Sequence, residues 1–327
     1  MNNVNEIETT HDFIDDQREW LIAHKRETGF SWSRLETPIN RPSSTLSMFC
    51  AGNYNKSKYL GGNDRIALDV YRYRQTLLAQ QQLRIDAPEK PKFFDTKASR
   101  IVMGLLTWAQ RGRIVVCVAP PGIGKTEAAR EYGDRASNAI YIRCRKSMKT
   151  ISALCTAVLI ALGNKSARGS ADALSRWVVS ELKNKGALLM FDDAQHLTLD
   201  MLEEIRGWWD EISVGVAFIG NEHVSSQMEG EARTAPYLAQ LFSRVAQTVV
   251  IPQAYPEDAE ALAAAWGVED EKAVDLVKEI ASRPGGLRDC TWTLENAITI
   301  ARSQGQELTR KHVAEAFAQR ASRPIAA

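Results

Sequence analysis

The residues best placed to do chemistry form the stretch APPGIGKT at positions 119–126. An apolar run at 113–119 precedes it and a helical pattern at 125–133 follows. Glycines let such a loop curl so that its N–H groups point at phosphate oxygens, and the start of the helix adds a partial positive charge. We therefore expect a phosphate-binding loop, in which Lys125 reaches the β- and γ-phosphates of ATP and the Thr126 hydroxyl ligates Mg²⁺. The other nucleotide-binding residues expected here are Pro121, Gly122, Ile123, Gly124 and Glu127.

A second candidate element is MFDDAQHL at 190–197, where an apolar run at 187–192 ends in two acids. Ligands of α/β sheets bind at the carboxyl ends of the strands, so we expect Asp192 to hold Mg²⁺ through water. We expect Asp193 to orient the water that attacks the nucleotide. Its alternative role is that of a helix N-cap, and the two roles can coexist. In an ATPase this position usually carries Glu, so Asp193 is one methylene shorter than the usual residue.

Three further residues are candidates for the same site. Asn221 follows an apolar run at 214–220, and its amide is expected to polarise the attacking water. Arg244, in LFSRV at 241–245, is expected to stabilise the transferring phosphoryl group, an effect worth roughly 10³–10⁵ in rate. Arg288, in PGGLRDC at 284–290, is expected to sense the nucleotide from a C-terminal helix. Each arginine alone is as well explained by a surface ion pair, but their order and separations favour the catalytic interpretation.

Apolar runs and helical patterns alternate through the middle of the chain, which predicts an α/β domain with a parallel sheet flanked by helices. The expected strands lie at 113–119, 139–143, 187–192 and 214–220. The expected helices lie at 125–133, 150–163, 171–186 and 199–212.

The chain divides into four expected parts. Residues 1–85 have helical patterns, and the stretch DAPEKPKFFD at 86–95 carries two prolines that break a helix, so it is expected to be a linker. Residues 96–254 form the α/β domain, and residues 255–327 show only helical periodicity, which predicts a C-terminal helical lid.

Short helices joined by tight turns within residues 1–85 favour an all-α helix-turn-helix module. The candidate recognition helix is at about 42–50, where serine and threonine side chains could bind bases or phosphates. Arg41, Lys56 and Lys58 are expected to hold the DNA backbone. The alternative is a small protein-interaction module whose hydroxyl side chains cap helices.

The densest basic cluster of the α/β domain is RCRKSMKT at 143–150, between an expected strand and an expected helix. We predict that it contacts DNA phosphates, with a second candidate at Arg233; the alternative is a solvated surface. The residues of the cluster in this prediction are Arg143, Arg145, Lys146 and Lys149.

The bulk composition limits the classes of protein. The 327 residues carry a formal net charge of only +1, so DNA binding must come from a local basic patch. The 5 cysteines are scattered without a C-x-x-C pair, which favours free thiols in a reducing compartment. The polar, acidic N-terminus is not a signal peptide, and no apolar run is long enough to span a membrane. We expect a cytoplasmic protein of a bacterial or phage-infected cell, with no membrane partner.

The order of these motifs resembles that of AAA+ ATPases, and among them the chain is most similar to the MuB group of transposition ATPases, with the related IstB and TnsC proteins. The similarity is carried by GIGKTEAAREY, DDAQHL, IGN, LFSRV and RPGGLRDC, and it extends over nearly the whole chain.

The resemblance implies an ATPase that binds Mg-ATP and forms helical filaments on double-stranded DNA without strong sequence preference. It also implies that the filament activates a DDE transposase, which stimulates hydrolysis and so disassembles it. Within such a homo-oligomer, Arg244 acts in trans, Arg288 senses in cis, and loops near residue 143 face the central channel. Because Asp193 replaces the family's Glu, we predict slow hydrolysis that DNA or transposase stimulates.

Three alternatives remain open from the sequence. The first is an AAA+ ATPase of the helicase-loader or secretion-associated type, and the second is an ATP-binding scaffold on DNA with negligible hydrolysis. The third is a sequence-specific repressor that uses residues 31–60.

Overall fold

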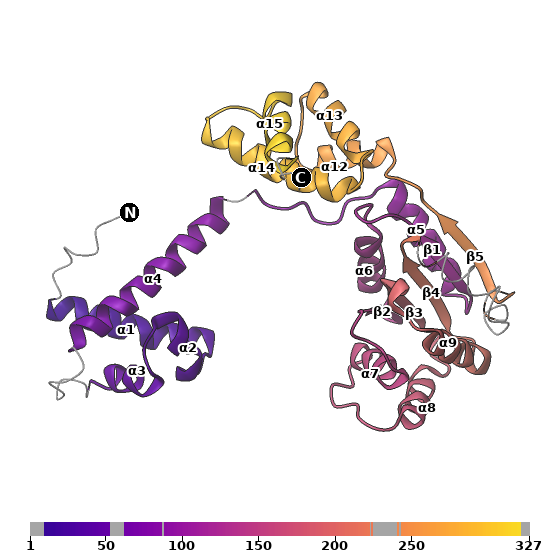
Figure 1. Cartoon of the computed structure of the whole chain (residues 1–327), viewed down its shortest axis with the longest axis horizontal. Coiled ribbons are helices and arrows are strands. Elements are labelled where there is room, and N and C mark those ends of the chain that lie inside the picture. Colours follow the sequence, from indigo (N-terminus) through magenta and orange to yellow (C-terminus); the bar gives the residue numbers. More distant parts are fainter. Residues whose placement is uncertain are drawn as a thin grey trace, which may run out of the picture. The chain divides into compact units, whose positions relative to one another are not determined.

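The computed structural model describes residues 10–52, 62–86, 88–222, 224, 241 and 243–321. The chain divides into two compact units, Met1–Ala87 and Pro88–Ala327 (Figure 1). The first unit contains α1 (His11–Thr28), α2 (Trp32–Ile39), α3 (Ser43–Cys50) and α4 (Asn63–Asp86).

A small apolar core holds the helices of the first unit together. Its members include Ile14 and Leu21 of α1, with Phe13 and Trp20 packed against them. Asn40 ends α2 in the left-handed conformation, and α3 begins three residues later. The α2–turn–α3 pair thus has the order of a helix-turn-helix, and the candidate recognition helix corresponds to α3.

The basic residues expected beside this helix are not all available for DNA. Arg41 donates to the carboxylate of Asp69 at 2.7 Å and pairs with it at 2.6 Å. Lys56 and Lys58 lie outside the described residues. A DNA-binding role for α3 therefore remains a prediction.

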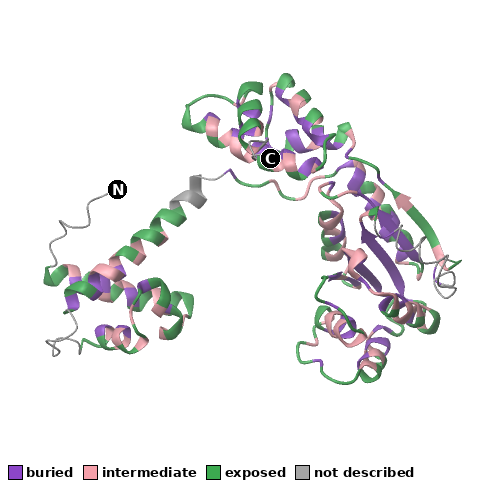
Figure 2. Cartoon of the chain, in the orientation of Figure 1, coloured by how far each residue is buried: buried purple, intermediate pink, exposed green. Residues whose placement is uncertain are grey.

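The second unit is built on a parallel sheet whose strand order is β2-β3-β4-β1-β5. The strands are β1 (Ile114–Val118), β2 (Ala139–Arg143), β3 (Leu188–Asp192), β4 (Gly215–Gly220) and β5 (Val245–Val250). The first four match the predicted apolar runs. β5 was not predicted, because it is an edge strand whose residues are largely exposed (Figure 2).

Alternate residues of each central strand pack into two different cores, which explains why these strands are apolar throughout. Val115 and Cys117 of β1 face one core, and Ile114 and Val116 face the other. The first face is covered by α5 (Lys97–Ala109) and α6 (Lys125–Arg135). The second face is covered by α7 (Ile151–Ala161), α8 (Ala171–Leu182) and α9 (Leu199–Ile212). α6 to α9 match the predicted helices, and α5 was not predicted.

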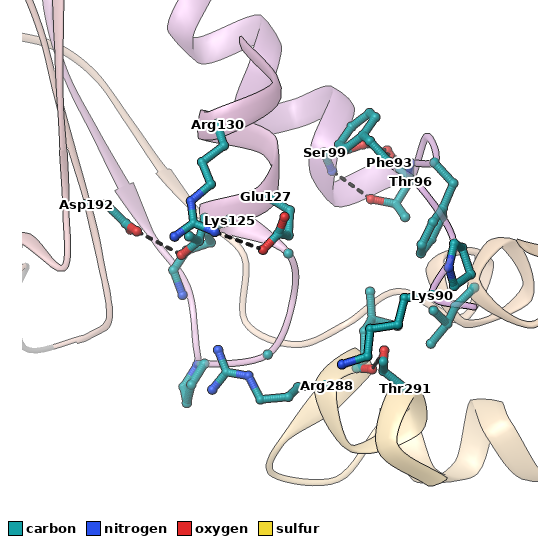
Figure 3. A pocket seen from close by; sticks show the side chains of 18 of the residues that line it. Lys90, Phe93, Thr96, Ser99, Lys125, Glu127, Arg130, Asp192, Arg288 and Thr291 are labelled. Carbon is teal, nitrogen blue, oxygen red and sulfur yellow. Dashed lines mark hydrogen bonds and ion pairs between the residues drawn. The ribbon is translucent and has the colours of Figure 1, made fainter. Parts of the chain in front are cut away.

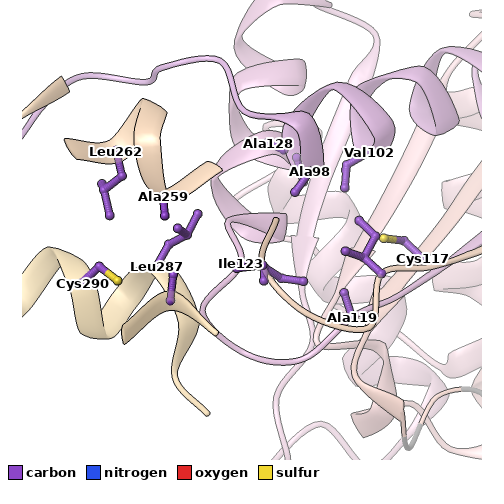
Figure 4. Close-up of a cluster of buried hydrophobic side chains, with 14 of the residues drawn as sticks. Ala98, Val102, Cys117, Ala119, Ile123, Ala128, Ala259, Leu262, Leu287 and Cys290 are labelled. Carbon is purple, nitrogen blue, oxygen red and sulfur yellow. The ribbon is translucent and has the colours of Figure 1, made fainter. Parts of the chain in front are cut away.

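The C-terminal helices join the first of these cores. They are α12 (Pro256–Ala265), α13 (Glu271–Ala281), α14 (Gly286–Ser303) and α15 (Arg310–Ala321). Leu262 of α12 and Leu287 of α14 belong to the same core as Ile123 of the glycine-rich loop (Figure 4). The fully buried Asp258 of α12 accepts a hydrogen bond from the backbone N–H of Lys97 at 2.6 Å and so joins α12 to the start of α5.

Each of the five cysteines is a free thiol, as expected. In the part of the chain that the structure describes, no helix combines the length and the apolarity needed to cross a membrane.

Candidate nucleotide site

The glycine-rich loop leaves the carboxyl end of β1 and leads directly into α6. Gly122 has φ 90° and Gly124, which is the N-cap of α6, has φ 89°. Such angles are strained for residues with a side chain, so these two glycines make the tight curl possible. The loop therefore has the strand–loop–helix context that phosphate binding requires.

Lys125 is held by its own loop. Its ammonium group donates to the carbonyl of Ala119 at 2.6 Å and to that of Pro120 at 2.8 Å. Burial lowers the pKa of Lys125, and the carboxylates of Asp192 and Asp193 oppose that change. A phosphate placed against this group would favour its charged form, because an anion compensates for the lost hydration.

Asp192 ends β3 with only 2% of its surface exposed. Its Oδ2 accepts from the Thr126 hydroxyl at 2.8 Å and from the Tyr141 hydroxyl at 2.7 Å. Burial, and then the bond to Asp192, raises the pKa of Tyr141. The predicted convergence of Thr126 and Asp192 is therefore present in this geometry, although β4 separates their two strands in the sheet. Tyr141 was not predicted.

Asp193 is held from two sides. Its Oδ1 accepts from the side-chain amide of Gln195 at 3.3 Å, and its Oδ2 lies 3.4 Å from Arg143. It precedes the short 3₁₀ turn η3 (Ala194–His196) without making a side-chain cap, and Thr198 caps α9 instead. The carboxylate is thus directed toward polar partners rather than toward a helix end.

Arg143 therefore differs from the rest of its basic cluster. It pairs with Asp193 and lines the cavity described below, and its contact with DNA stays a prediction. The parallel register of β2 and β3 explains this position, because it places Arg143 opposite Asp192.

The C-terminal helices α12–α15, which form the predicted lid, contact the glycine-rich loop through backbone atoms. The N–H of Arg288 donates to the carbonyl of Gly122 at 3.2 Å. A Cβ placed on Gly122 would lie 1.9 Å from the carbonyl oxygen of Gly285, so no side chain fits there. Figure 3 shows the Arg288 side chain reaching toward the loop.

A cavity of about 680 Å³ opens between these elements. Most of the predicted nucleotide-site residues line it, including Asn221, Glu127 and Pro121. Glu127 pairs with Arg130 at 3.7 Å. Ile123 does not belong to the lining, because its side chain is buried in the core beneath the loop.

The expected linker forms one wall of this cavity, which sequence reasoning missed. Phe93 and Phe94 line it together with Lys90, whose ammonium group lies 3.7 Å from Glu295 of α14. Trp266 and Thr291 contribute from the lid side. The sequence signal for this wall was the pair of adjacent aromatic residues, Phe93 and Phe94, within the segment expected to be a linker.

Arg244 lies apart from this cavity. It precedes β5, whose first residue pairs with Ile114 at the amino end of β1, whereas the loop follows the carboxyl end. Its Nε donates to Asp210 of α9 at 2.8 Å.

The other basic candidates are exposed on the loop after β2. Arg145, Lys146 and Lys149 face solvent, while Cys144 and Met148 anchor the loop in the core. No ion pair involves these three basic residues within the described ranges. Thr150 caps α7, and Arg233 lies outside the described residues.

Comparison with known families agrees with this architecture. The model of the AAA domain matches residues 109–228, which include the loop, β3 and β4. The fold and site thus define an AAA-domain protein. The model described as Mu B transposition protein, C terminal, matches residues 243–319, which include the lid.

Curated relatives match nearly the whole chain. The ATP-dependent target DNA activator B of Escherichia phage Mu is 31% identical over 297 residues, covering 90% of this chain and 91% of that protein. The Mu-like prophage FluMu DNA transposition protein B of Haemophilus influenzae is 32% identical over 275 residues, covering 84% and 93%. The chain therefore belongs to the Mu B family of ATP-dependent target DNA activators, and the predicted family is confirmed.

A solved structure supports the fold alone. The Aeropyrum pernix ORC2 protein superposes with a TM-score of 0.56 at 14% identity, covering 72% of this chain and 71% of that chain. The predicted α/β AAA fold with N-terminal helices and a C-terminal helical region is thereby confirmed.

The contact between loop and lid generates a first prediction. Gly122→Ala should push the loop and the lid apart, because the new Cβ collides with the Gly285 carbonyl. In the absence of nucleotide, the backbone amide of Arg288 should then exchange its hydrogen roughly tenfold faster than in the wild type. Hydrogen exchange followed by mass spectrometry measures this.

Gly124→Ala is the matched control. It has nearly the same positive φ, yet nothing lies within 4 Å of its Cβ. Equal acceleration in both variants would contradict this prediction. It would show that strain in the loop, and not the collision with the lid, causes the faster exchange of the Arg288 amide.

Proposed function

We propose that this chain is an ATPase that assembles on double-stranded DNA and activates a DDE transposase. It binds Mg-ATP, forms a homo-oligomeric filament without strong sequence preference, and hydrolyses ATP to ADP and phosphate as the filament disassembles. The observation that carries the proposal is the Thr126–Asp192 pair beneath a phosphate-binding loop, in a chain of the Mu B family.

The residues fit a magnesium nucleotide. Thr126 and Asp192 offer a hydroxyl and a carboxylate 2.8 Å apart, and Mg²⁺ prefers oxygen ligands. Bound there, the metal would neutralise charge on the phosphates. Lys125 would exchange its bonds to the loop carbonyls for bonds to phosphate, and Arg288 would approach from the lid.

Hydrolysis is proposed to be slow. Asp193 must orient the attacking water with a short side chain, and Arg143 and Gln195 already occupy its two oxygens. Asn221 lines the same cavity and is proposed to polarise that water. Removing a positioned base altogether costs roughly 10²–10⁴ in rate, so a shortened and engaged base should cost less.

Arg244 is proposed to act on the nucleotide of a neighbouring subunit. β1 has 5 residues, so the amino and carboxyl edges of the sheet are about 15 Å apart at the usual rise of a strand. Arg244 lies at the amino edge and its own nucleotide cavity at the carboxyl edge. A head-to-tail arrangement of subunits would bring the two together.

The loop after β2 is the proposed DNA contact. Arg145, Lys146 and Lys149 are exposed side by side on a loop that two buried residues anchor. Positive side chains on a fixed loop suit the regular phosphates of a duplex and carry no base preference. Arg233 is proposed as a further contact.

Negative-stain microscopy with plain duplex DNA tests the proposal, with phosphate release measured in the same tubes. Filaments that need ATP and release phosphate slowly are the expected result. Assembly indifferent to ATP, or none with it, would favour a helicase-loader type of protein or a site-specific regulator. ATP-dependent filaments whose hydrolysis neither DNA nor transposase stimulates would identify an ATP-binding scaffold.

Asp193→Glu should raise ATP turnover on DNA by about tenfold, because the longer side chain brings the carboxylate to the attacking water. Asp193→Asn should lower turnover and leave ATP affinity unchanged. Phosphate-release assays at saturating ATP measure both. Unchanged turnover in Asp193→Glu would remove Asp193 from the hydrolytic step.

Replacing Lys146 and Lys149 together by Ala should weaken binding to duplexes of any sequence. The slope of log affinity against log salt should become shallower by about 2, since two phosphate contacts are lost. Fluorescence anisotropy at several salt concentrations measures this. Lys165→Ala with Lys311→Ala removes the same charge from exposed positions elsewhere, and it should leave the slope as it is.

A further inference from the structure

The last turn of α9 holds Arg244 in one place. Asp210 accepts from the Nε of Arg244 at 2.8 Å through Oδ1, while its Oδ2 forms a short contact with Arg206. Arg206 is held in turn by Glu203 at 2.9 Å. The side chains of Arg244 and Asp210 are 28% and 35% exposed, so the pair is partly shielded from water.

The position of Asp210 is unusual for a helix. The carboxyl end of a helix carries a partial negative charge, which disfavours an acid in the last turn. Asp210 and Glu211 both lie in the last turn of α9, and no basic residue lies there. The ion pairs with Arg206 and Arg244 offset this unfavourable position.

Trp209 supports the same arginine. Its ring centroid lies 6.0 Å from the Arg244 guanidinium. The indole N–H donates to the carbonyl of Gly112 at 2.9 Å, which fixes the ring to the turn before β1. That turn is itself tightly packed, because a Cβ on Gly112 would lie 2.6 Å from the carbonyl oxygen of Ser213. Asp210 and Trp209 thus bind Arg244 to two rigid elements at the amino edge of the sheet.

We infer that Asp210 is the positioning residue for Arg244, fixing the direction in which this arginine enters the nucleotide site of the next subunit. The inference rests on the proposed action of Arg244 in trans. An arginine side chain has many rotamers, and a catalytic group held in one orientation avoids losing that freedom during the reaction. In this role Asp210 acts through Arg244.

Asp210→Asn keeps the shape of the side chain and removes the charge. DNA-stimulated ATP hydrolysis should fall by about tenfold or more, and by less than in Arg244→Ala. ATP affinity and filament formation should not change. Asp210→Glu should recover part of the rate, and Glu203→Gln, which removes the other partner of Arg206, should have a small effect. The double variant of Asp210→Asn with Arg244→Ala should be no slower than Arg244→Ala alone.

Mixing two variants separates positioning from a structural role. Asp210→Asn subunits keep an intact nucleotide site, and Asp193→Asn subunits keep an intact Arg244. In a head-to-tail assembly with random mixing, about a quarter of the sites combine a working site with a working neighbour. An equal mixture should therefore recover about a quarter of the wild-type rate, although each variant alone is slow.

The possible outcomes separate the role of Asp210 from the proposed action of Arg244 in trans. A full rate in Asp210→Asn when Arg244→Ala is slow overturns the role of Asp210 alone. So does a mixture no faster than the mean of its components, provided that an equal mixture of Arg244→Ala with Asp193→Asn does recover about a quarter of the rate. If that second mixture also fails, the action of Arg244 in trans is overturned. An unimpaired Arg244→Ala overturns the role of Arg244 itself. Loss of ATP binding or of filaments in Asp210→Asn would show that Asp210 is structural and would also overturn the inference.

Discussion

The candidate nucleotide site depends on keeping one buried carboxylate, Asp192, in place. A charge with 2% exposure is costly unless polar groups surround it, and the hydroxyls of Thr126 and Tyr141 supply them. These three side chains come from three separate parts of the chain: the start of α6, the strand β2 and the end of β3. Because the strands are parallel, the carboxyl ends of β1 and β3 lie at one edge of the sheet, and the Tyr141 hydroxyl reaches Asp192 from the middle of β2. The loop and the lid are then built around this edge.

The lid is part of the same packed body as the loop. Ile123, although it belongs to the phosphate-binding motif, is buried in a core that also contains Leu287 and Leu262 of the lid (Figure 4). On the cavity side, Gly122 meets Gly285 and Arg288 through backbone atoms. A displacement of the loop when nucleotide binds would therefore also displace α14, because close-packed backbones leave no space between them.

The two edges of the sheet divide the chemistry between them. The carboxyl edge gathers the residues of the candidate nucleotide site, and the amino edge holds Arg244 with Asp210 and Trp209. The length of a five-residue strand separates them. If Arg244 contributes to hydrolysis, a single subunit is incomplete, which links turnover to assembly in a protein of the Mu B family.

The sequence by itself determined the four central strands and their alternation with helices, because strands buried on both faces are apolar throughout. It also determined the phosphate-binding loop, because the tight curl of that loop requires glycine at positions 122 and 124. It also carried the family resemblance.

Only the tertiary structure decided what depends on neighbours far along the chain. β5 escaped detection because an edge strand needs no apolar pattern. Arg143 joined Asp193, rather than the exposed lysines, through the register of β2 with β3. The proline-containing segment became a wall of the cavity, and Asp210 met Arg244 across 34 residues, because folding fixes such pairs and sequence spacing does not.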